Sequence, residues 1–239
     1  MKAVSLEELL ESGAHFGHQA KRWHPQMKSY IYGARNGIHI FDLVQTKKGL
    51  EEACQYIQKI TSEGKTLIFV GTKRQAQAII TEEAKKAGFP YVANRWLGGT
   101  ISNWQQIKRS VEKLVEMTRK RDAGEYKGYT KKERSLFDQE ITRLTRRVGG
   151  LTGLKDLPEA IFVVDVKGEV AAVLEAKSKG VTVVAITDTN VDQSLVDYVI
   201  PANDDAVGAI KLLVAALALA AKTGRETWEK KQIKINKAT

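Results

Sequence analysis

The sequence lacks most of the features that mark a secreted, disulfide-bonded or membrane-spanning protein. Cys54 is the only cysteine among its 239 residues, which excludes an internal disulfide and a cysteine-rich zinc site and fits a reducing compartment. Glutamates interrupt the apolar residues of segment 4–11, so we expect no signal peptide at the start of the chain. The most apolar segment, 206–221, contains Lys211 and falls short of the roughly 18 uninterrupted apolar residues of a membrane helix. We therefore expect a soluble cytoplasmic protein.

Carboxylates are absent from residues 12–41, although the whole chain contains 28 Asp and Glu. The same segment holds all four histidines and a series of cations that alternate with aromatic side chains. Cations pair with phosphates, and flat side chains stack on unpaired bases. This composition favours a nucleic-acid-binding segment over the alternative, a solvated loop with a few core anchors. The candidate contact residues are Lys21, Arg22, Trp23, His24, Lys28 and Arg35.

The charge of the chain is positive and unevenly distributed. The formal net charge is +10 and the pI is about 9.5, which points to an acidic partner such as nucleic acid or an anionic membrane. Residues 103–149 carry 13 Lys and Arg against 7 Asp and Glu, whereas residues 150–222 carry 6 against 10. We therefore expect the acidic later part of the chain to face a different neighbour.

Short apolar runs alternate with helix-forming segments over most of the chain. Residues 66–71, 161–165 and 181–187 are mostly apolar, as in strands buried on both faces, and helical patterns lie between them. Strands that alternate with helices predict a parallel sheet covered on both sides. Shorter strands are expected at 30–32, 38–40, 91–93 and 198–201, and further helices at 6–12, 46–62 and 204–222.

Residues 103–149 break this alternation. Apolar residues recur there every three or four positions in two series, which predicts two helices with narrow seams. The series are Ile107, Val111 and Leu114, then Phe137, Ile141, Leu144 and Val148. We expect a coiled-coil hairpin that projects from a discontinuous α/β domain; two ordinary packed helices are the alternative. The expected units are 1–102 with 150–222 (α/β domain), 103–149 (hairpin) and 223–239 (charged tail). The hairpin cations expected to lie against nucleic acid are Lys108, Arg109, Arg119, Lys120, Arg121, Lys131, Lys132 and Arg134.

Two connecting segments offer further phosphate contacts. Residues 71–74 (GTKR) follow a strand and begin a helix, where open α/β folds bind anions, and they supply Lys73 and Arg74. The glycine spacing matches neither the dinucleotide fingerprint nor the P-loop, and a solvated helix start explains the segment about as well. Residues 94–104 place Arg95 beside two tryptophans, to which we assign a mainly structural role.

Three carboxylates stand after predicted strands, where they would converge at one edge of the sheet. Asp188 ends one strand, and Asp204 and Asp205 follow another. Together with His18 they would suit a divalent cation, although turn formation and helix capping explain them more simply. No arrangement of Ser, Cys or His suggests a catalytic site, but many α/β folds are enzymes, so the missing motif alone decides little. We expect no cofactor beyond this candidate cation.

Several long motifs resemble a known family. The motifs are GAHFGHQAKRWHPQMKSYIYGARNGIHIFDL, FVGTKRQAQ, NRWLGGTISNW, DLPEAIFVVD, AITDTN and VIPANDDA. Their order is that of the bacterial ribosomal protein S2 family, and the resemblance covers nearly the whole chain. It implies a flavodoxin-like, doubly wound parallel α/β fold with an inserted, protruding α-helical coiled-coil hairpin and no enzymatic activity.

The resemblance also implies partners. A member of that family is a structural constituent of the small ribosomal subunit, binds small-subunit ribosomal RNA between head and body, and helps dock the messenger-binding ribosomal protein S1. Neighbouring ribosomal proteins are further expected partners, whereas a membrane or a small-molecule substrate is not. Two interpretations from other classes stay open: a phospho-ligand-binding α/β enzyme that uses residues 71–74, and a coiled-coil protein-interaction module.

Overall fold

The computed structural model describes residues 4–238, and side chains up to residue 234. Its main sheet has five parallel strands in the order β5-β4-β6-β7-β8. Counted along the chain this order is 2-1-3-4-5, the flavodoxin-like arrangement, so the predicted fold class is confirmed. The strands are β4 (Leu67–Val70), β5 (Tyr91–Val92), β6 (Ala160–Val164), β7 (Thr182–Thr187) and β8 (Tyr198–Pro201).

The sheet is buried on both faces, which explains its continuous apolar strands. Alternate side chains point to opposite faces, so Phe69 and Phe162 join one core while Ile68 and Ile161 join the other. The first core contains buried side chains of α2 (Leu43–Ser62), α3 (Gln77–Ala87) and α7 (Val207–Ala238). The second contains side chains of α6 (Val170–Ser178) and of the helices inserted after β5.

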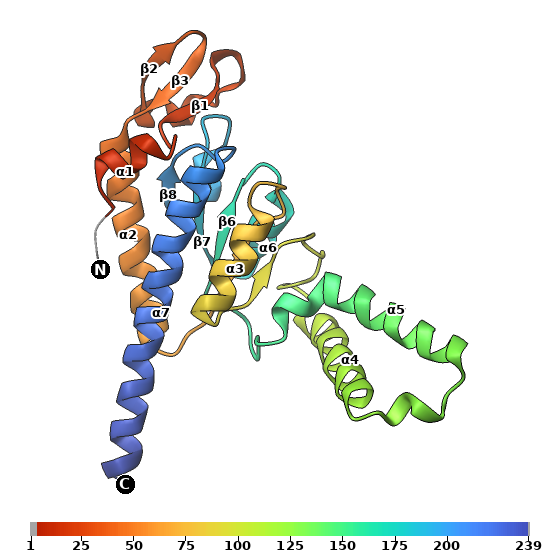
Figure 1. Cartoon of the computed structure of the whole chain (residues 1–239). Coiled ribbons are helices and arrows are strands. Elements are labelled where there is room, and N and C mark those ends of the chain that lie inside the picture. The colour runs from red at the N-terminus through yellow and green to blue at the C-terminus, as the bar shows by residue number, and fades with distance from the viewer. Residues whose placement is uncertain (1–3, 239) are drawn as a thin grey trace.

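A smaller antiparallel sheet lies at one end of the molecule, next to the short helix α1 (Leu6–Glu11) (Figure 1). Its strands β1 (Phe16–Gln19), β2 (Ile31–Arg35) and β3 (Ile38–Phe41) have the order β1-β3-β2. Asn36 and Gly37 join β2 to β3 with φ values of 52° and 75°, the left-handed conformation that an Asn-Gly turn adopts readily. Short 3-10 turns, η1 (Ala20–Arg22) and η2 (Pro25–Tyr30), connect β1 to β2.

The insertion after β5 forms a helical hairpin that projects from the α/β body (Figure 1). Helix α4 (Trp104–Asp122) runs outward, the turn η3 (Glu125–Gly128) reverses the chain, and α5 (Lys131–Val148) returns. Buried seam residues join the two helices near the body, and Tyr126 stacks on Phe137 near the tip with ring centroids 4.4 Å apart. The projection agrees with the sequence, while supercoiling of the pair stays a prediction. The turns η4 (Gly149–Leu151) and η5 (Gln193–Leu195) complete the described elements.

Helix α7 is longer than the sequence suggested. We expected a helix that ends near residue 222 and a separate charged tail, but the helix continues to Ala238. The added turns pack on the body: Gly224 lies against Thr61 of α2, and the Arg225 guanidinium lies 4.4 Å from the centre of the Phe89 ring. These contacts supply the stabilisation that the polar composition of residues 223–234 does not reveal.

Among the described residues, α7 alone is long and apolar enough to pass as a membrane span. Its apolar side chains Ile210, Leu213 and Leu217 are fully buried. They belong to the core that α7 forms with α2, α3 and the sheet. Burial inside the protein therefore accounts for the composition of this helix.

Candidate functional site

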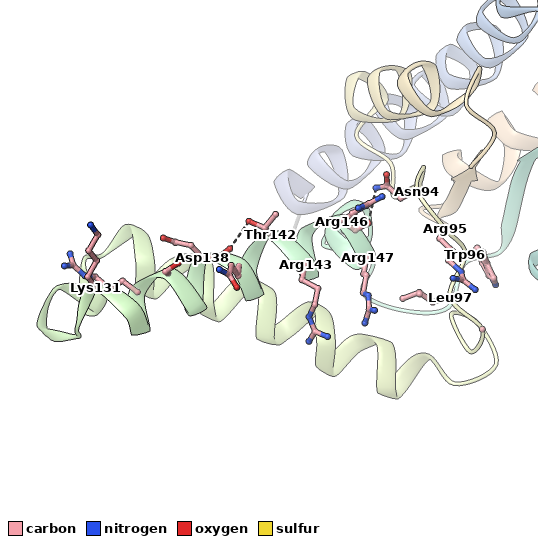
Figure 2. Close-up of a pocket in the computed structure, with 14 residues that line it drawn as sticks. Asn94, Arg95, Trp96, Leu97, Lys131, Asp138, Thr142, Arg143, Arg146 and Arg147 are labelled. Atoms are coloured by element: carbon pink, nitrogen blue, oxygen red, sulfur yellow. Dashed lines mark hydrogen bonds between the residues drawn. The ribbon is translucent and has the colours of Figure 1, made fainter.

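A broad basic groove lies between the segment after β5 and the outer side of α5 (Figure 2). Its volume is about 1310 Å³, and Asp138 is the one carboxylate among its lining residues. The lining cations are Arg95, Lys131, Arg134, Arg143, Arg146 and Arg147. The sequence predicted the first three of these cations as contacts and missed the last three.

The positions of the groove cations follow from helical spacing. Arg143, Arg146 and Arg147 are three or four residues apart, so they share one side of α5. The seam residues Ile141 and Leu144 are buried on the other side, against α4. The same periodicity that locates the seam therefore also locates the basic side, and this signal was available in the sequence.

The segment across the groove is held by one carboxylate. Glu175 of α6 accepts hydrogen bonds from Trp96 Nε1 at 2.9 Å and from the backbone amides of Ile101 and Ser102 at 2.8 and 2.7 Å. Burial opposes ionisation of Glu175, but these hydrogen bonds outweigh it and lower its pKa. Trp96 thus has the structural role expected from the sequence, and Arg95 beside it is left exposed on the groove.

The N-terminal basic segment, residues 12–41, lies at the end of the molecule away from the hairpin (Figure 1). Lys21, Arg22, Lys28 and Arg35 are exposed, and none of them forms an ion pair with the described residues. Trp23 is also exposed, with its ring 5.5 Å from that of His39. In the described structure these side chains are therefore available to contact a partner.

His24 and the remaining predicted contact residues differ in whether they are already bonded to other parts of the chain. The His24 amide donates a hydrogen bond to the Thr189 carbonyl at 2.7 Å, which fixes the segment to the α/β body. Arg119, Lys120 and Arg121 pair with neighbouring carboxylates on the hairpin at 3.2, 2.6 and 3.0 Å. The exposed or half-exposed predicted contacts that form no such pair with any described residue are Lys108, Arg109, Lys131, Lys132, Arg134 and Arg74.

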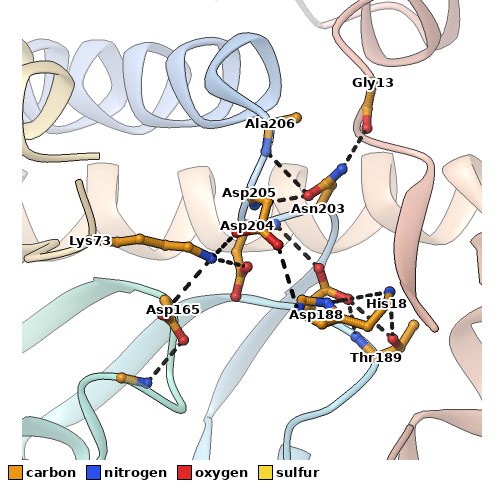
Figure 3. Close-up of polar contacts among 11 residues, drawn as sticks. Gly13, His18, Lys73, Asp165, Asp188, Thr189, Asn203, Asp204, Asp205 and Ala206 are labelled. Carbon is orange, nitrogen blue, oxygen red and sulfur yellow. Dashed lines mark hydrogen bonds and ion pairs between the residues drawn. The ribbon is translucent and has the colours of Figure 1, made fainter. Parts of the chain in front are cut away.

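Lys73, which the sequence offered as a phosphate contact, is occupied by carboxylates (Figure 3). Its ammonium lies 2.6 Å from oxygens of both Asp204 and Asp205 and 3.9 Å from Asp165. The neighbouring backbone amide of Thr72 donates to Glu169 at 2.9 Å. The positions at which open α/β folds bind an anion are thus filled from within the chain. This arrangement disfavours both a phosphate contact by Lys73 and a phospho-ligand enzyme.

The four residues of the candidate cation site do come together (Figure 3). Potential ligand atoms of His18, Asp188 and Asp204 all lie within 4.8 Å of one another. His18 Nδ1 is 2.9 Å from Asp188, and His18 Nε2 is 3.6 Å from Asp205. The Lys73 ammonium already supplies a cation here, so metal binding stays a prediction.

The electrostatics of this cluster follow from burial and crowding. Burial, helped by the neighbouring Asp188, raises the pKa of Asp204 to about 7. The hydrogen bond to Asp188 raises the pKa of His18 despite its partial burial. The simpler explanation offered by the sequence, a turn, is seen at Asp188, whose backbone carbonyl accepts the Val191 amide at 3.3 Å and whose side chain accepts the Thr189 amide at 2.6 Å. At the other strand end Asn203, rather than either aspartate, accepts the amides of Asp205 and Ala206.

Comparison with known proteins assigns this chain to a family. Residues 9–224 match the family model described as Ribosomal protein S2. The small ribosomal subunit protein uS2 of Chloroflexus aggregans is 47% identical over 231 residues, 97% of each chain. Its counterpart in Coprothermobacter proteolyticus is 48% identical over 226 residues, 95% of this chain and 84% of the relative. The uS2c protein of Emiliania huxleyi is 45% identical over 229 residues, 96% and 100% of the two chains. The match spans most of both the α/β body and the inserted hairpin, and this chain therefore belongs to the ribosomal protein S2 family.

Proposed function

We propose that this chain is a structural constituent of the small ribosomal subunit in the cytoplasm and that it binds small-subunit ribosomal RNA through its basic surfaces. Its relatives are named as small ribosomal subunit proteins, and none of those names describes an enzyme. The observation that carries the RNA-binding proposal is the groove of six cations around a single carboxylate. Clustered cations of this kind bind phosphate backbones by releasing counterions.

The groove suits a folded RNA better than a small ligand. Its sides are two separately anchored elements, α5 and the segment that Glu175 holds, so the backbone that carries the cations is in place before the partner arrives. A volume of about 1310 Å³ exceeds the usual range of about 300–1,000 Å³ for small-molecule pockets. Five of the six groove cations are arginines, whose guanidinium groups pair with phosphate oxygens in a bidentate way.

The N-terminal basic segment is the second proposed RNA contact. Its exposed cations are available for phosphates, and Trp23 is placed to stack on a base or sugar. Lys73 is left out of the proposed contacts because three carboxylates surround its ammonium. The position between head and body, and the docking of ribosomal protein S1, are the finer parts of the proposal and rest on the family resemblance.

The rival from another class is a coiled-coil protein-interaction module whose positive charge only promotes solubility. The two readings differ in salt dependence, because each phosphate contact adds roughly 0.7 to 0.9 to the slope of log affinity against log salt. If the chain is instead a module that binds protein through the hairpin seam, its RNA affinity should not fall when groove cations are neutralised. Salt titration of RNA binding therefore separates the two.

The test replaces three groove cations together, Arg134→Gln, Arg146→Gln and Arg147→Gln. Binding to purified small-subunit ribosomal RNA is measured by filter retention between 50 and 300 mM salt. We expect the slope to fall by about two to three, together with weaker binding at every salt concentration. The matched control removes three exposed lysines of α7, Lys222→Gln, Lys230→Gln and Lys231→Gln. Equal slopes for the two triple variants would falsify the groove as the RNA-binding surface.

A further inference from the structure

Residues of α1, β2 and the start of α2 line an apolar groove. These elements lie at the end of the molecule opposite the hairpin (Figure 1). Its volume is about 320 Å³, enough for one or two large side chains. Three of its lining side chains are unusually exposed for apolar residues: Tyr32 at 83%, Val44 at 63% and Leu10 at 54%. Exposed apolar residues that cluster in a concave surface, rather than scattering singly, mark interaction sites.

The charge beside this groove is opposite to that of the chain. Glu7 and Asp42 are the charged residues in its lining, and Glu11 is exposed on the same short helix. Among the described residues no Lys or Arg lines it, although the chain as a whole carries a net charge of +10. Carboxylates at this position repel RNA phosphates and favour a partner that presents cations.

The groove is preorganised by local hydrogen bonds. Ser5 and Glu8 form a capping box that begins α1, with Ser5 Oγ accepting the Glu8 amide at 3.1 Å and Glu8 accepting the Ser5 amide at 2.8 Å. Asp42 caps α2 by accepting the Val44 amide at 2.9 Å. Phe41, which is nearly fully buried, forms the floor. A partner that binds here therefore meets a rigid surface, which lowers the entropy lost on binding.

We propose that this groove docks a basic, amphipathic segment of a neighbouring protein, with apolar side chains between Leu10 and Val44 and cations beside Glu7 and Asp42. A second copy of this chain is a poor fit, because a symmetric contact would bring the carboxylates of the two copies together. The groove lies apart from the hairpin, so the inference does not depend on RNA binding through the basic groove, although Tyr32 and Phe41 belong to the N-terminal basic segment.

Photocrosslinking in assembled small subunits identifies the occupant. p-Benzoylphenylalanine replaces Tyr32, small subunits are purified and irradiated, and the crosslinked peptides are identified by mass spectrometry. The expected product joins residue 32 to a protein segment with Lys or Arg interleaved with apolar residues. Crosslinks to RNA, to an acidic segment or to another copy of this chain would overturn the proposal, as would the absence of any crosslink.

A peptide-binding experiment tests the chemistry with the isolated full chain. The probes are an 18-residue amphipathic peptide of Leu and Lys and its counterpart with Glu in place of Lys. We expect the Lys peptide to bind at least tenfold more tightly, and the double variant Leu10→Lys, Val44→Lys to lose at least tenfold in that binding. Leu174→Lys, at a residue of α6 that is 52% exposed, is the matched control and should change nothing. Equal binding of both peptides, or equal loss in the control, contradicts the proposal.

Discussion

At the scale of single residues, His18 links the N-terminal sheet to the α/β body through a cluster of ionisable groups. Asp188 faces its Nδ1, Asp205 faces its Nε2, and Asp204 and Lys73 complete the cluster (Figure 3). Asp188 raises the pKa of His18 above its ordinary value of 6.5, so the folded state favours the protonated imidazole. The stabilisation is complete below pH 6.5 and is lost as pH rises through the folded-state pKa.

The direction of this change in stability with pH gives the residue-scale prediction. The pKa of Asp204, raised to about 7, acts in the same direction, because a folded state that binds more protons loses stability as pH rises. We therefore expect the free energy of unfolding in urea to fall between pH 5.5 and pH 8.5. The variant His18→Gln should show a smaller fall, since only the Asp204 part remains.

The measurement is made with a chelator present, so that no added cation enters the cluster. His39, which is not part of the cluster, provides the matched variant His39→Gln. A fall for His18→Gln as large as that for the unchanged chain would show that His18 does not titrate against Asp188.

The sequence located these residues only in part. Asp188 and Asp204 follow strands that are neighbours in the sheet, so strand order alone brings them together at its carboxyl edge. The surroundings of Lys73 were not predictable, because sequence spacing places it at a strand end but does not show which carboxylates lie within reach of its long side chain. Its ammonium bridges residues 131 and 132 positions away in the chain, and only tertiary structure determines such contacts.

At the scale of elements, strands and the hairpin were the most predictable features. Continuous apolar runs fixed β4, β6 and β7, and the seam periodicity fixed α4 and α5 to within a few residues. The end of α7 was not predictable, because Gly224 and the polar residues after it are typical of a helix end. The structure shows instead that Gly224 sits where α7 passes close to α2.

Gly224→Ala gives the element-scale prediction. Helix propensity alone would make this change stabilising by about 1 kcal/mol. A Cβ at this position, however, would collide with Thr61 Oγ1 and lie 2.5 Å from the Gln58 carbonyl oxygen, which belongs to the backbone of α2. Overpacking of this kind costs about 1–3 kcal/mol, so we expect net destabilisation.

The free energy of unfolding in urea measures this balance. Gly153→Ala is the control, because no atom lies within 4 Å of a Cβ built at Gly153. An increase in stability for Gly224→Ala would mean that α7 does not pack closely on α2 in solution.

At the scale of the whole molecule, the positive charge divides between two distant surfaces. The N-terminal basic segment lies at one end and the groove along the hairpin at the other, with the α/β body between them (Figure 1). The composition of the sequence predicted both surfaces. It did not show that they lie apart, or that the aspartates around His18 lie within the body that separates them. An RNA that folds around the protein suits two such distant surfaces better than a single compact RNA helix does.

Two sets of neutralising substitutions give the whole-molecule prediction. One set is Lys21→Gln, Arg22→Gln and Arg35→Gln, and the other is the groove triple variant at Arg134, Arg146 and Arg147. If both surfaces bind one folded RNA and share no contact residue, their losses in binding free energy add, because distant sites act independently. We expect each set alone to lower the salt slope by about two to three and the combined set by about twice that amount.

Filter binding of the four proteins to purified small-subunit ribosomal RNA measures these slopes under identical conditions. Sedimentation of the same proteins with small subunits from a cell lysate gives an independent readout, with ribonuclease treatment as its control. A combined variant no weaker than the groove variant would mean that the N-terminal segment does not touch RNA. Its exposed cations and Trp23 would then serve a protein neighbour, and the RNA-binding surface of this chain would be the hairpin groove alone.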